Sequence, residues 1–190
     1  MTAQPSIRAG EQAWLDHDHE TGYVELIGGE LIVAGGSTPT HQRMVSRYEG
    51  LLNRIKPDGE VFIAPLGVKL ADDYIPEPDV FWVSAANPMQ EDGLRLIGIP
   101  DLIIEIASPT SQRRDRFDKF RLYERVGVKE YWISDSETYI TEVYALENKK
   151  YALVGKYAPE ESFESPLLRQ TIDLKAVFAA LPPAVQLPDP

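Results

Sequence analysis

Glu105 is the residue whose surroundings most clearly call for a chemical explanation. It lies inside the segment 101–107 (DLIIEIA), where its immediate neighbours are all apolar. A buried carboxylate without a partner is costly, so it either takes up a proton or finds a cation. We therefore predict a functional role for Glu105, because perturbed carboxylates concentrate at sites. The alternatives are that it faces an open groove or bonds a nearby basic residue.

Asp79 is a second carboxylate in a position that suits metal binding. It follows Pro78 and begins the apolar segment 78–83 (PDVFWV), so we expect it at the end of a sheet rather than in its middle. Taken alone, Asp79 is also compatible with an ordinary aspartate at the start of a strand. Paired with Glu105 on a neighbouring strand, it supplies the hard oxygen ligands that Mg²⁺ and Mn²⁺ prefer.

Lys119 lies in a helix that we predict over 110–126. Helical spacing places Lys119 on one side with Asp115, Leu122 and Val126, facing the sheet. The spacing also predicts an opposite, solvated side, made of Arg114, Asp118, Arg121 and Arg125. Periodicity leaves two interpretations of Lys119 open: it reaches toward the sheet, or it forms an i, i+4 ion pair with Asp115 inside the helix.

The histidines and Glu30 have simpler explanations. His41 lies three residues before Met44, at the edge of an apolar helical face, where a histidine is more often a hydrogen-bonded residue than a catalyst. Glu30 directly follows two glycines and fits a solvated hairpin. His17 and His19 lie in an acidic stretch that fits a solvated N-terminal segment better than a loose metal site. Cysteine is absent, which excludes thiolate chemistry and disulfides.

The elements that must position these residues follow from periodicity and from turn residues. A hairpin is expected over 23–34, and a helix follows it, capped by Thr38 and ended by 57–59. Further strands are expected at 60–70, 78–83, 101–107, 130–134, 139–146 and 151–156, with a short helix at 173–180. In the strand over 60–70, Pro65 and Gly67 indicate an edge strand or a bulge. The strand–helix–strand unit 101–134 should join parallel strands by a right-handed crossover. The fold class is therefore α/β (α+β), a mixed sheet flanked by helices.

Composition limits the class of protein. A chain of 190 residues accommodates a single domain. It has 30 acidic and 19 basic residues, a net charge of −11, which argues against tight nonspecific binding to nucleic acid. Divalent cations can offset such a charge locally. Neither a signal peptide nor an apolar run of roughly 20 residues is visible, so we expect a soluble, cytoplasmic protein with no membrane segment.

Several motifs, in order, resemble the Uma-two family, which is placed in the PD-(D/E)XK nuclease superfamily. The matching segments are YVELIGGE (23–30), PTHQ (39–42), PEPDV (76–80), PDLIIEIASP (100–109), RDRFDKF (114–120) with Tyr123, GVKEYWI (127–133), SPL (165–167) and DL (173–174). The resemblance covers roughly residues 20–180. It implies a restriction-endonuclease-like core within a single domain, 1–190, whose N-terminal segment and proline-rich tail are peripheral.

The resemblance also implies site roles. Asp79 matches the aspartate of the Pro-Asp motif and Glu105 the acidic residue of the second half-motif, while Ala107 stands where that motif has lysine. Lys119 takes the lysine's role and Glu30 adds a carboxylate near the metal. We expect His41, Asp115 and Tyr123 to support the site.

The implied reaction is hydrolysis of phosphodiester bonds of nucleic acid with Mg²⁺ or Mn²⁺. The alternative is a catalytically inactive protein of the same fold that binds a partner, an interpretation favoured by Ala107 and the acidic charge. In either case we expect a homo-oligomer, such as a homodimer.

Overall fold

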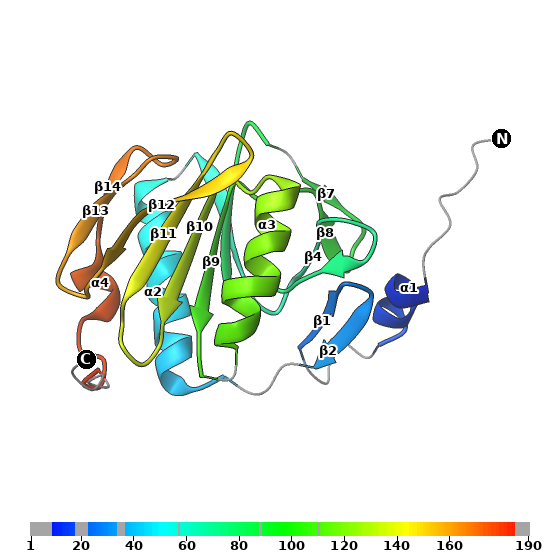
Figure 1. The fold of residues 1–190 in the computed structure, drawn as a ribbon, viewed down its shortest axis with the longest axis horizontal. Coiled ribbons are helices and arrows are strands. Elements are labelled where there is room, and N and C mark those ends of the chain that lie inside the picture. Colours follow the sequence, from blue (N-terminus) through cyan, green and yellow to red (C-terminus); the bar gives the residue numbers. More distant parts are fainter. Residues whose placement is uncertain are drawn as a thin grey trace.

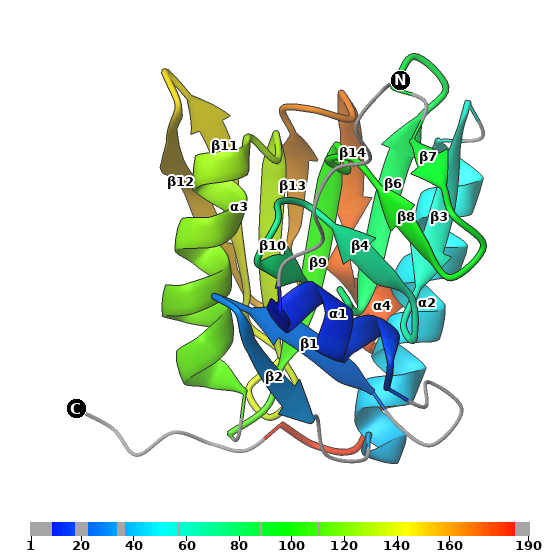
Figure 2. The same ribbon diagram turned by 90° about the vertical axis from the view of Figure 1, so that its right-hand side faces the viewer.

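A computed structural model describes residues 9–17, 23–33, 37–56, 58–87, 89–109 and 111–184. His19, Pro57 and the end of the proline-rich tail lie outside these ranges. At the centre is a six-stranded mixed sheet with helix α2 on one face and helix α3 on the other (Figures 1 and 2). None of the described helices is long and apolar enough to cross a membrane.

The central sheet confirms the predicted mixed topology. In spatial order its strands are β12 (Lys150–Tyr157), β11 (Thr141–Glu147), β10 (Glu130–Asp135), β9 (Leu102–Ala107), β6 (Val80–Ser84) and β3 (Gly59–Ile63). Strands β9 and β10 are parallel, as the strand–helix–strand unit predicts, and every other neighbouring pair is antiparallel.

Two long helical segments cover this sheet. Helix α2 (Pro39–Ile55) begins as predicted, with the Thr38 side chain accepting a hydrogen bond from the His41 amide. Its apolar face is buried at Met44, Val45, Tyr48, Leu51 and Leu52. On the other side, a π-helical turn, η1 (Arg114–Lys119), continues directly into α3 (Phe120–Val126). Both helices begin at the lower end of the molecule in Figure 1, where β9 and β10 end.

Smaller elements surround this core. They are α1 (Ala9–Leu15), the sheet of β2 (Glu30–Val33), β1 (Val24–Ile27) and β5 (Tyr74–Ile75), the sheet of β4 (Gly67–Lys69), β8 (Arg95–Ile97) and β7 (Gln90–Glu91), the pair β13 (Ser162–Ser165) and β14 (Gln170–Asp173), and α4 (Leu174–Phe178). The predicted hairpin is confirmed, and Gly28 and Gly29 turn it with φ of 63° and 84°. Periodicity does not predict α1, β5, β7, β8, β13 or β14.

The single strand predicted over 60–70 is wrong. Strand β3 ends at Ile63, and the chain re-enters a different sheet as β4 at Gly67. Pro65 has no amide hydrogen to continue a ladder, so the strand breaks there. Gly67 is required beyond the break, because a Cβ at this position would lie 2.6 Å from the Trp14 ring.

The alternation of side chains along β9 decides where Glu105 points. Leu102 and Ile104 belong to the apolar cluster that packs against α2, whereas Ile103 and Ala107 belong to the cluster that packs against α3. Successive residues of a strand face opposite sides of the sheet. Glu105 therefore falls on the α3 side, beneath the helix that carries Lys119.

Candidate active site

A pocket of about 430 Å³ is lined by residues of the β1 sheet, the start of α2, the end of β9 and the start of η1. Its lining includes Asp79, Glu105, Lys119, His41 and Asp115, which the sequence places far apart along the chain. The structure thus brings together most of the residues singled out from the sequence.

Asp79 lies directly before β6 and is held by two donors. Its Oδ2 accepts a hydrogen bond of 2.7 Å from the Ile106 amide on the neighbouring strand β9. Its Oδ1 lies 3.1 Å from His41 Nε2 at the start of α2. The Asp79 side chain is 18% exposed, so a carboxylate fixed on two sides still faces the pocket.

Glu105 is almost completely buried and is hydrogen-bonded through one oxygen. Its Oε1 accepts from Lys119 Nζ at 2.9 Å and from the Tyr123 hydroxyl at 2.7 Å. No donor from the described residues lies on Oε2. Burial raises the pKa of Glu105 well above its ordinary value, against the Lys119 charge and with help from the Asp79 and Asp115 carboxylates.

Lys119 points toward the sheet and also keeps the i, i+4 ion pair with Asp115, so both interpretations left open by periodicity are present in the structure. Its Nζ lies 2.8 Å from Glu25 Oε1 and 2.9 Å from Glu105 Oε1, but 3.9 Å from Asp115 Oδ1. Burial lowers the pKa of Lys119, but the surrounding carboxylates, Glu105 first, outweigh burial and hold that pKa well above its ordinary value. The surrounding carboxylates therefore favour the charged form of this buried ammonium group.

Glu25 is the residue that the sequence argument overlooks. It lies in β1, only 3% exposed, and accepts hydrogen bonds from Arg114 at 2.9 Å and from the Glu77 amide at 3.0 Å, besides contacting Lys119. Burial raises its pKa, but Lys119 and Arg114 reverse that effect and lower it. The sequence does contain a signal for Glu25, because this residue interrupts the apolar run YVELI just as Glu105 interrupts its own apolar run.

Glu30 lies elsewhere. It begins β2, its side chain is exposed, and it is not among the residues that line the pocket. The expectation of Glu30 as an extra metal carboxylate is therefore corrected. The hairpin does contribute a carboxylate, but from Glu25 on the inner strand, because Glu30 stands at the turn on the outer strand.

The prediction that Arg114 lies on the solvated side of the second helix is wrong. This side chain is 24% exposed, lines the pocket and pairs with Glu25. The error has a geometric cause: η1 is π-helical, and its wider turn changes the angular spacing on which the helical wheel depends. Asp118, Arg121 and Arg125 are exposed, as predicted. Asp115 is buried, and burial raises its pKa.

Two polar atoms in the pocket are buried without a hydrogen-bond partner among the described residues. One is His41 Nδ1 and the other is Glu77 Oε2. Burial lowers the pKa of His41, but its bond to Asp79 more than compensates and raises it. Burial, with the Glu25 carboxylate, raises the pKa of Glu77 to about 7. Both atoms are therefore polar groups of the pocket lining whose hydrogen bonds are not made within the described part of the chain.

The donor chemistry of the pocket fits a hard divalent cation. Among the described residues no three His, Asp or Glu side chains form a ready-made metal site. Mg²⁺ does not require one, since it usually binds one or two carboxylates and completes its shell with water and substrate phosphates. Asp79 and the unoccupied Oε2 of Glu105 are oxygen donors of that kind.

The mixed sheet and the pocket at the end of its central strands define a restriction-endonuclease-like protein. The chain belongs to the Uma2 family, described as "Putative restriction endonuclease", which it matches over residues 12–176. It also resembles a crystal structure of a "putative nuclease belonging to DUF820" from Anabaena variabilis, with a TM-score of 0.72 and 18% identity over 88% of this chain and 96% of that one. At this identity the likeness shows the fold. Comparison with curated proteins finds no match.

Proposed function

We propose that the pocket is the active site of a metal-dependent nuclease that hydrolyses phosphodiester bonds of nucleic acid. The observation that carries the proposal is the meeting of Asp79, Glu105 and Lys119 in one pocket, from three separate elements. Family membership supports the same conclusion, because the family is described as "Putative restriction endonuclease".

Asp79 and Glu105 would hold Mg²⁺ or Mn²⁺ in this proposal. When bound, the ion supplies Lewis-acid stabilisation of the negative charge that develops on the phosphate. The chain prepares the two carboxylates: the Ile106 amide and His41 fix Asp79, while Tyr123 and Lys119 occupy one oxygen of Glu105 and leave the other free.

Lys119 acts as a fixed positive charge. The carboxylates around it, Glu105 first, raise its pKa against the effect of burial and so favour its positively charged form. An ammonium group held between Glu25 and Glu105 is placed to stabilise charge on a phosphate or to orient the attacking water. In the reaction the water oxygen bonds to phosphorus, one P–O ester bond breaks, and the leaving oxygen takes up a proton.

The test is cleavage of single-stranded DNA, duplex DNA and RNA with Mg²⁺ and with Mn²⁺. Glu105→Gln and Asp79→Asn should each lower the cleavage rate by at least about 100-fold, because each removes a charge at the proposed metal. Lys119→Met should have a similar effect. Circular dichroism should show all three variants folded; if Lys119→Met is not, the two carboxylate variants decide the result.

Glu160→Gln is the matched control, since Glu160 is an exposed carboxylate in the turn before β13. It should cleave as wild type does. Undiminished cleavage by the double variant Asp79→Asn, Glu105→Gln would show that the activity arises elsewhere. No cleavage of any substrate by folded wild type, together with no metal binding in calorimetry, would favour the alternative, a binding protein that retains the fold.

A further inference from the structure

The helix next to the pocket is basic in an acidic protein. Between Arg113 and Gly127 the sequence has six basic and three acidic residues, although the whole chain carries a net charge of −11. Three of the six basic side chains are exposed, namely Arg113, Arg121 and Arg125. The proposed mechanism uses none of these three.

An aromatic side chain lies in the same row. Phe117 is 57% exposed, which is unusual for a phenylalanine. Arg113, Phe117, Arg121 and Arg125 follow one another at intervals of four residues along η1 and α3, and all four side chains are exposed. We call these four residues the basic row. No hydrogen bond or ion pair within the described part of the chain occupies Arg113 or Arg121, whereas the Arg125 guanidinium lies 4.6 Å from the centre of the Tyr74 ring.

The basic row ends in a second pocket. This pocket has a volume of about 720 Å³ and lies between the end of α3 and the β11–β12 turn. Its charged lining consists of Arg121, Arg125, Lys149, Lys150 and one carboxylate, Glu124. Lys150 neutralises Glu124 at 2.8 Å, and Lys149 stands exposed in the turn with φ of 64°. The pocket is therefore cationic.

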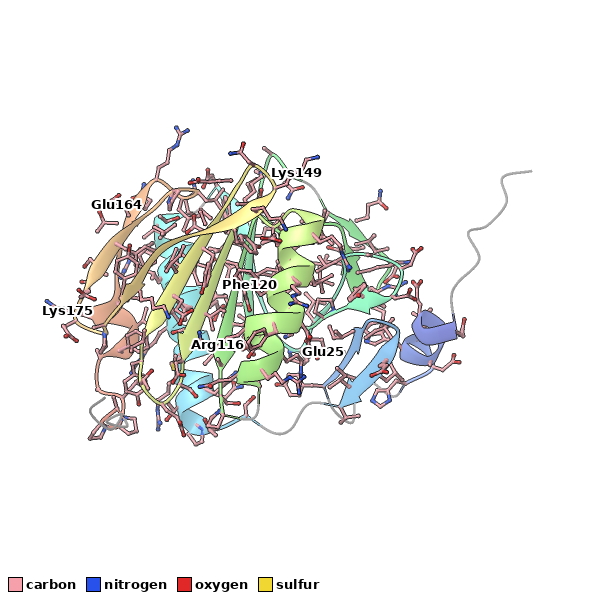
Figure 3. All side chains as sticks on the ribbon, in the orientation of Figure 1. Glu25, Arg116, Phe120, Lys149, Glu164 and Lys175 are labelled. Atoms are coloured by element: carbon pink, nitrogen blue, oxygen red, sulfur yellow. The ribbon has the colours of Figure 1, made fainter. Side chains whose placement is uncertain are left out.

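The basic row runs along the helix from the residue before Arg114 to the second pocket. Arg113 is one residue from Arg114, which lines the candidate active site, and Arg125 lines the second pocket. At the α-helical rise of 1.5 Å per residue the row would span about 18 Å, and the π-helical part makes it shorter. In Figure 3, Lys149 lies at one end of this helix, and Glu25 and Arg116 lie near the other. The row therefore runs between the two ends of the helix, with Arg114 of the candidate active site next to Arg113 and the second pocket at Arg125.

We propose that the basic row and the second pocket bind a single-stranded segment of the nucleic-acid substrate and lead it into the active site. This inference rests on the proposed nuclease function and adds the form of the substrate. Arginine and lysine side chains along a groove neutralise successive phosphates, and an exposed aromatic ring stacks on a base. Stacking on Phe117 requires an unpaired base, so the row selects a single strand over a duplex.

Acidic residues near the basic row weaken its attraction for phosphates. Asp118 is exposed beside Arg121 and Arg114, and Glu147 precedes the cationic turn. The binding should therefore be weak and steeply dependent on salt. This expectation agrees with the overall negative charge, which opposes association with nucleic acid outside the row.

Fluorescence anisotropy of a labelled single-stranded oligonucleotide, with EDTA present to prevent cleavage, tests the proposal. The triple variant Arg113→Gln, Arg121→Gln, Lys149→Gln should bind at least about tenfold more weakly at low salt. Its plot of log affinity against log salt should be shallower by about 2, since each lost phosphate contact contributes about 0.7 for a single strand. Phe117→Leu should weaken single-strand binding about tenfold and leave duplex binding unchanged.

The matched control is Arg54→Gln, Arg169→Gln, Lys175→Gln, which changes the net charge equally at three exposed positions on other elements. It should bind nearly as wild type. Equal losses in both triple variants would show a nonspecific charge effect and overturn the proposal. Three other results would also overturn the proposal: the wild type does not bind the single strand, it binds duplex more tightly, or an acidic peptide competes equally well.

Two results separate the role of the basic row from the nuclease activity. Cleavage that is identical in wild type and the triple variant, including KM, would leave the nuclease intact and overturn the basic row. Binding that depends on the row without cleavage by any form of the protein would support the row and contradict the nuclease.

Discussion

At the residue scale, the site is a balance of buried charges. Glu25 and Glu105 are each almost fully buried, and the Lys119 ammonium lies within 3 Å of both. A buried ion pair gains little over apolar packing, but removing one partner leaves an uncompensated charge. The arrangement is therefore better explained by positioning than by stability. The arrangement holds the Lys119 ammonium group against Glu105. Arg114, which is partly exposed, balances the negative charge of Glu25.

Glu25→Gln should reveal this positioning role. Loss of the charge that anchors Lys119 and Arg114 should lower cleavage about 10- to 100-fold, the usual effect of residues that orient a site. Glu30→Gln, on the neighbouring strand but exposed, should change cleavage by less than about twofold. The rates of the two variants, measured side by side, check the assignment. A greater loss in Glu30→Gln would restore the role implied by the family resemblance.

At the element scale, η1 is tied to the sheet by a charged cluster outside the pocket. Arg116 Nη1 lies 2.6 Å from Glu142 Oε1 on β11, and Lys156 Nζ of β12 lies 2.9 Å from the same oxygen. The Tyr144 hydroxyl donates to the other oxygen at 2.6 Å. Together these contacts join the π-helical turn that carries Lys119 to the central sheet. Figure 3 shows Arg116 at the start of the helix.

The stabilisation by Glu142 should depend on pH. Burial raises its pKa, but Tyr144, Arg116 and Lys156 outweigh burial and lower it below the ordinary value of 4.5. The stabilisation is therefore complete above pH 4.5 and is lost as the pH falls through the lower folded pKa. Because its basic partners are partly exposed, Glu142→Gln should cost about 1 kcal/mol at pH 7.

Urea unfolding of wild type and Glu142→Gln between pH 7 and pH 3 measures this dependence. The difference in free energy of unfolding should shrink toward zero at the acidic end. Glu160→Gln should show no comparable dependence. A constant difference across the whole range would mean that the substitution acts through packing and not through the ion pairs.

At the scale of the whole molecule, α1 joins the small sheets to one another. Trp14 is 1% exposed and donates a hydrogen bond of 2.8 Å from its ring to the Val24 carbonyl in β1. Its ring also fills the space beside Gly67 in β4. Glu11 on the same helix lies 2.7 Å from both Lys69 and Arg95. Helix α1 thus supports the strand that carries Glu25.

Trp14→Ala should lower the free energy of unfolding by about 3–5 kcal/mol, because it leaves a large cavity and an unpaired carbonyl. Chemical denaturation measures the change. Leu153→Ala, at a side chain that is 50% exposed on β12, should change it by less than about 0.5 kcal/mol. Similar stabilities of the two variants would show that α1 is peripheral to the fold.

The sequence alone determined the elements whose signal is local. Hydrophobic patterns identify the hairpin, α2 and most strands of the central sheet. Helix α2 buries one apolar face, whereas β9 is an apolar run buried on both faces. The unusual burial of a charge likewise identifies Glu105, because a carboxylate among apolar residues is conspicuous without any structure. Asp79 can be predicted from its position after Pro78, at the start of an apolar strand. The family resemblance rests on the same local motifs, and the match over residues 12–176 confirms it.

Only the tertiary structure decided which charges meet. Lys119 contacts Glu25 and Glu105 as well as Asp115, and periodicity within one helix cannot show contacts to residues on other elements. The choice between Glu25 and Glu30 depends on how the hairpin packs, since both flank the same turn. The convergence of β1, α2, β9 and η1 on one pocket is a property of packing between segments distant in sequence, which no local pattern encodes.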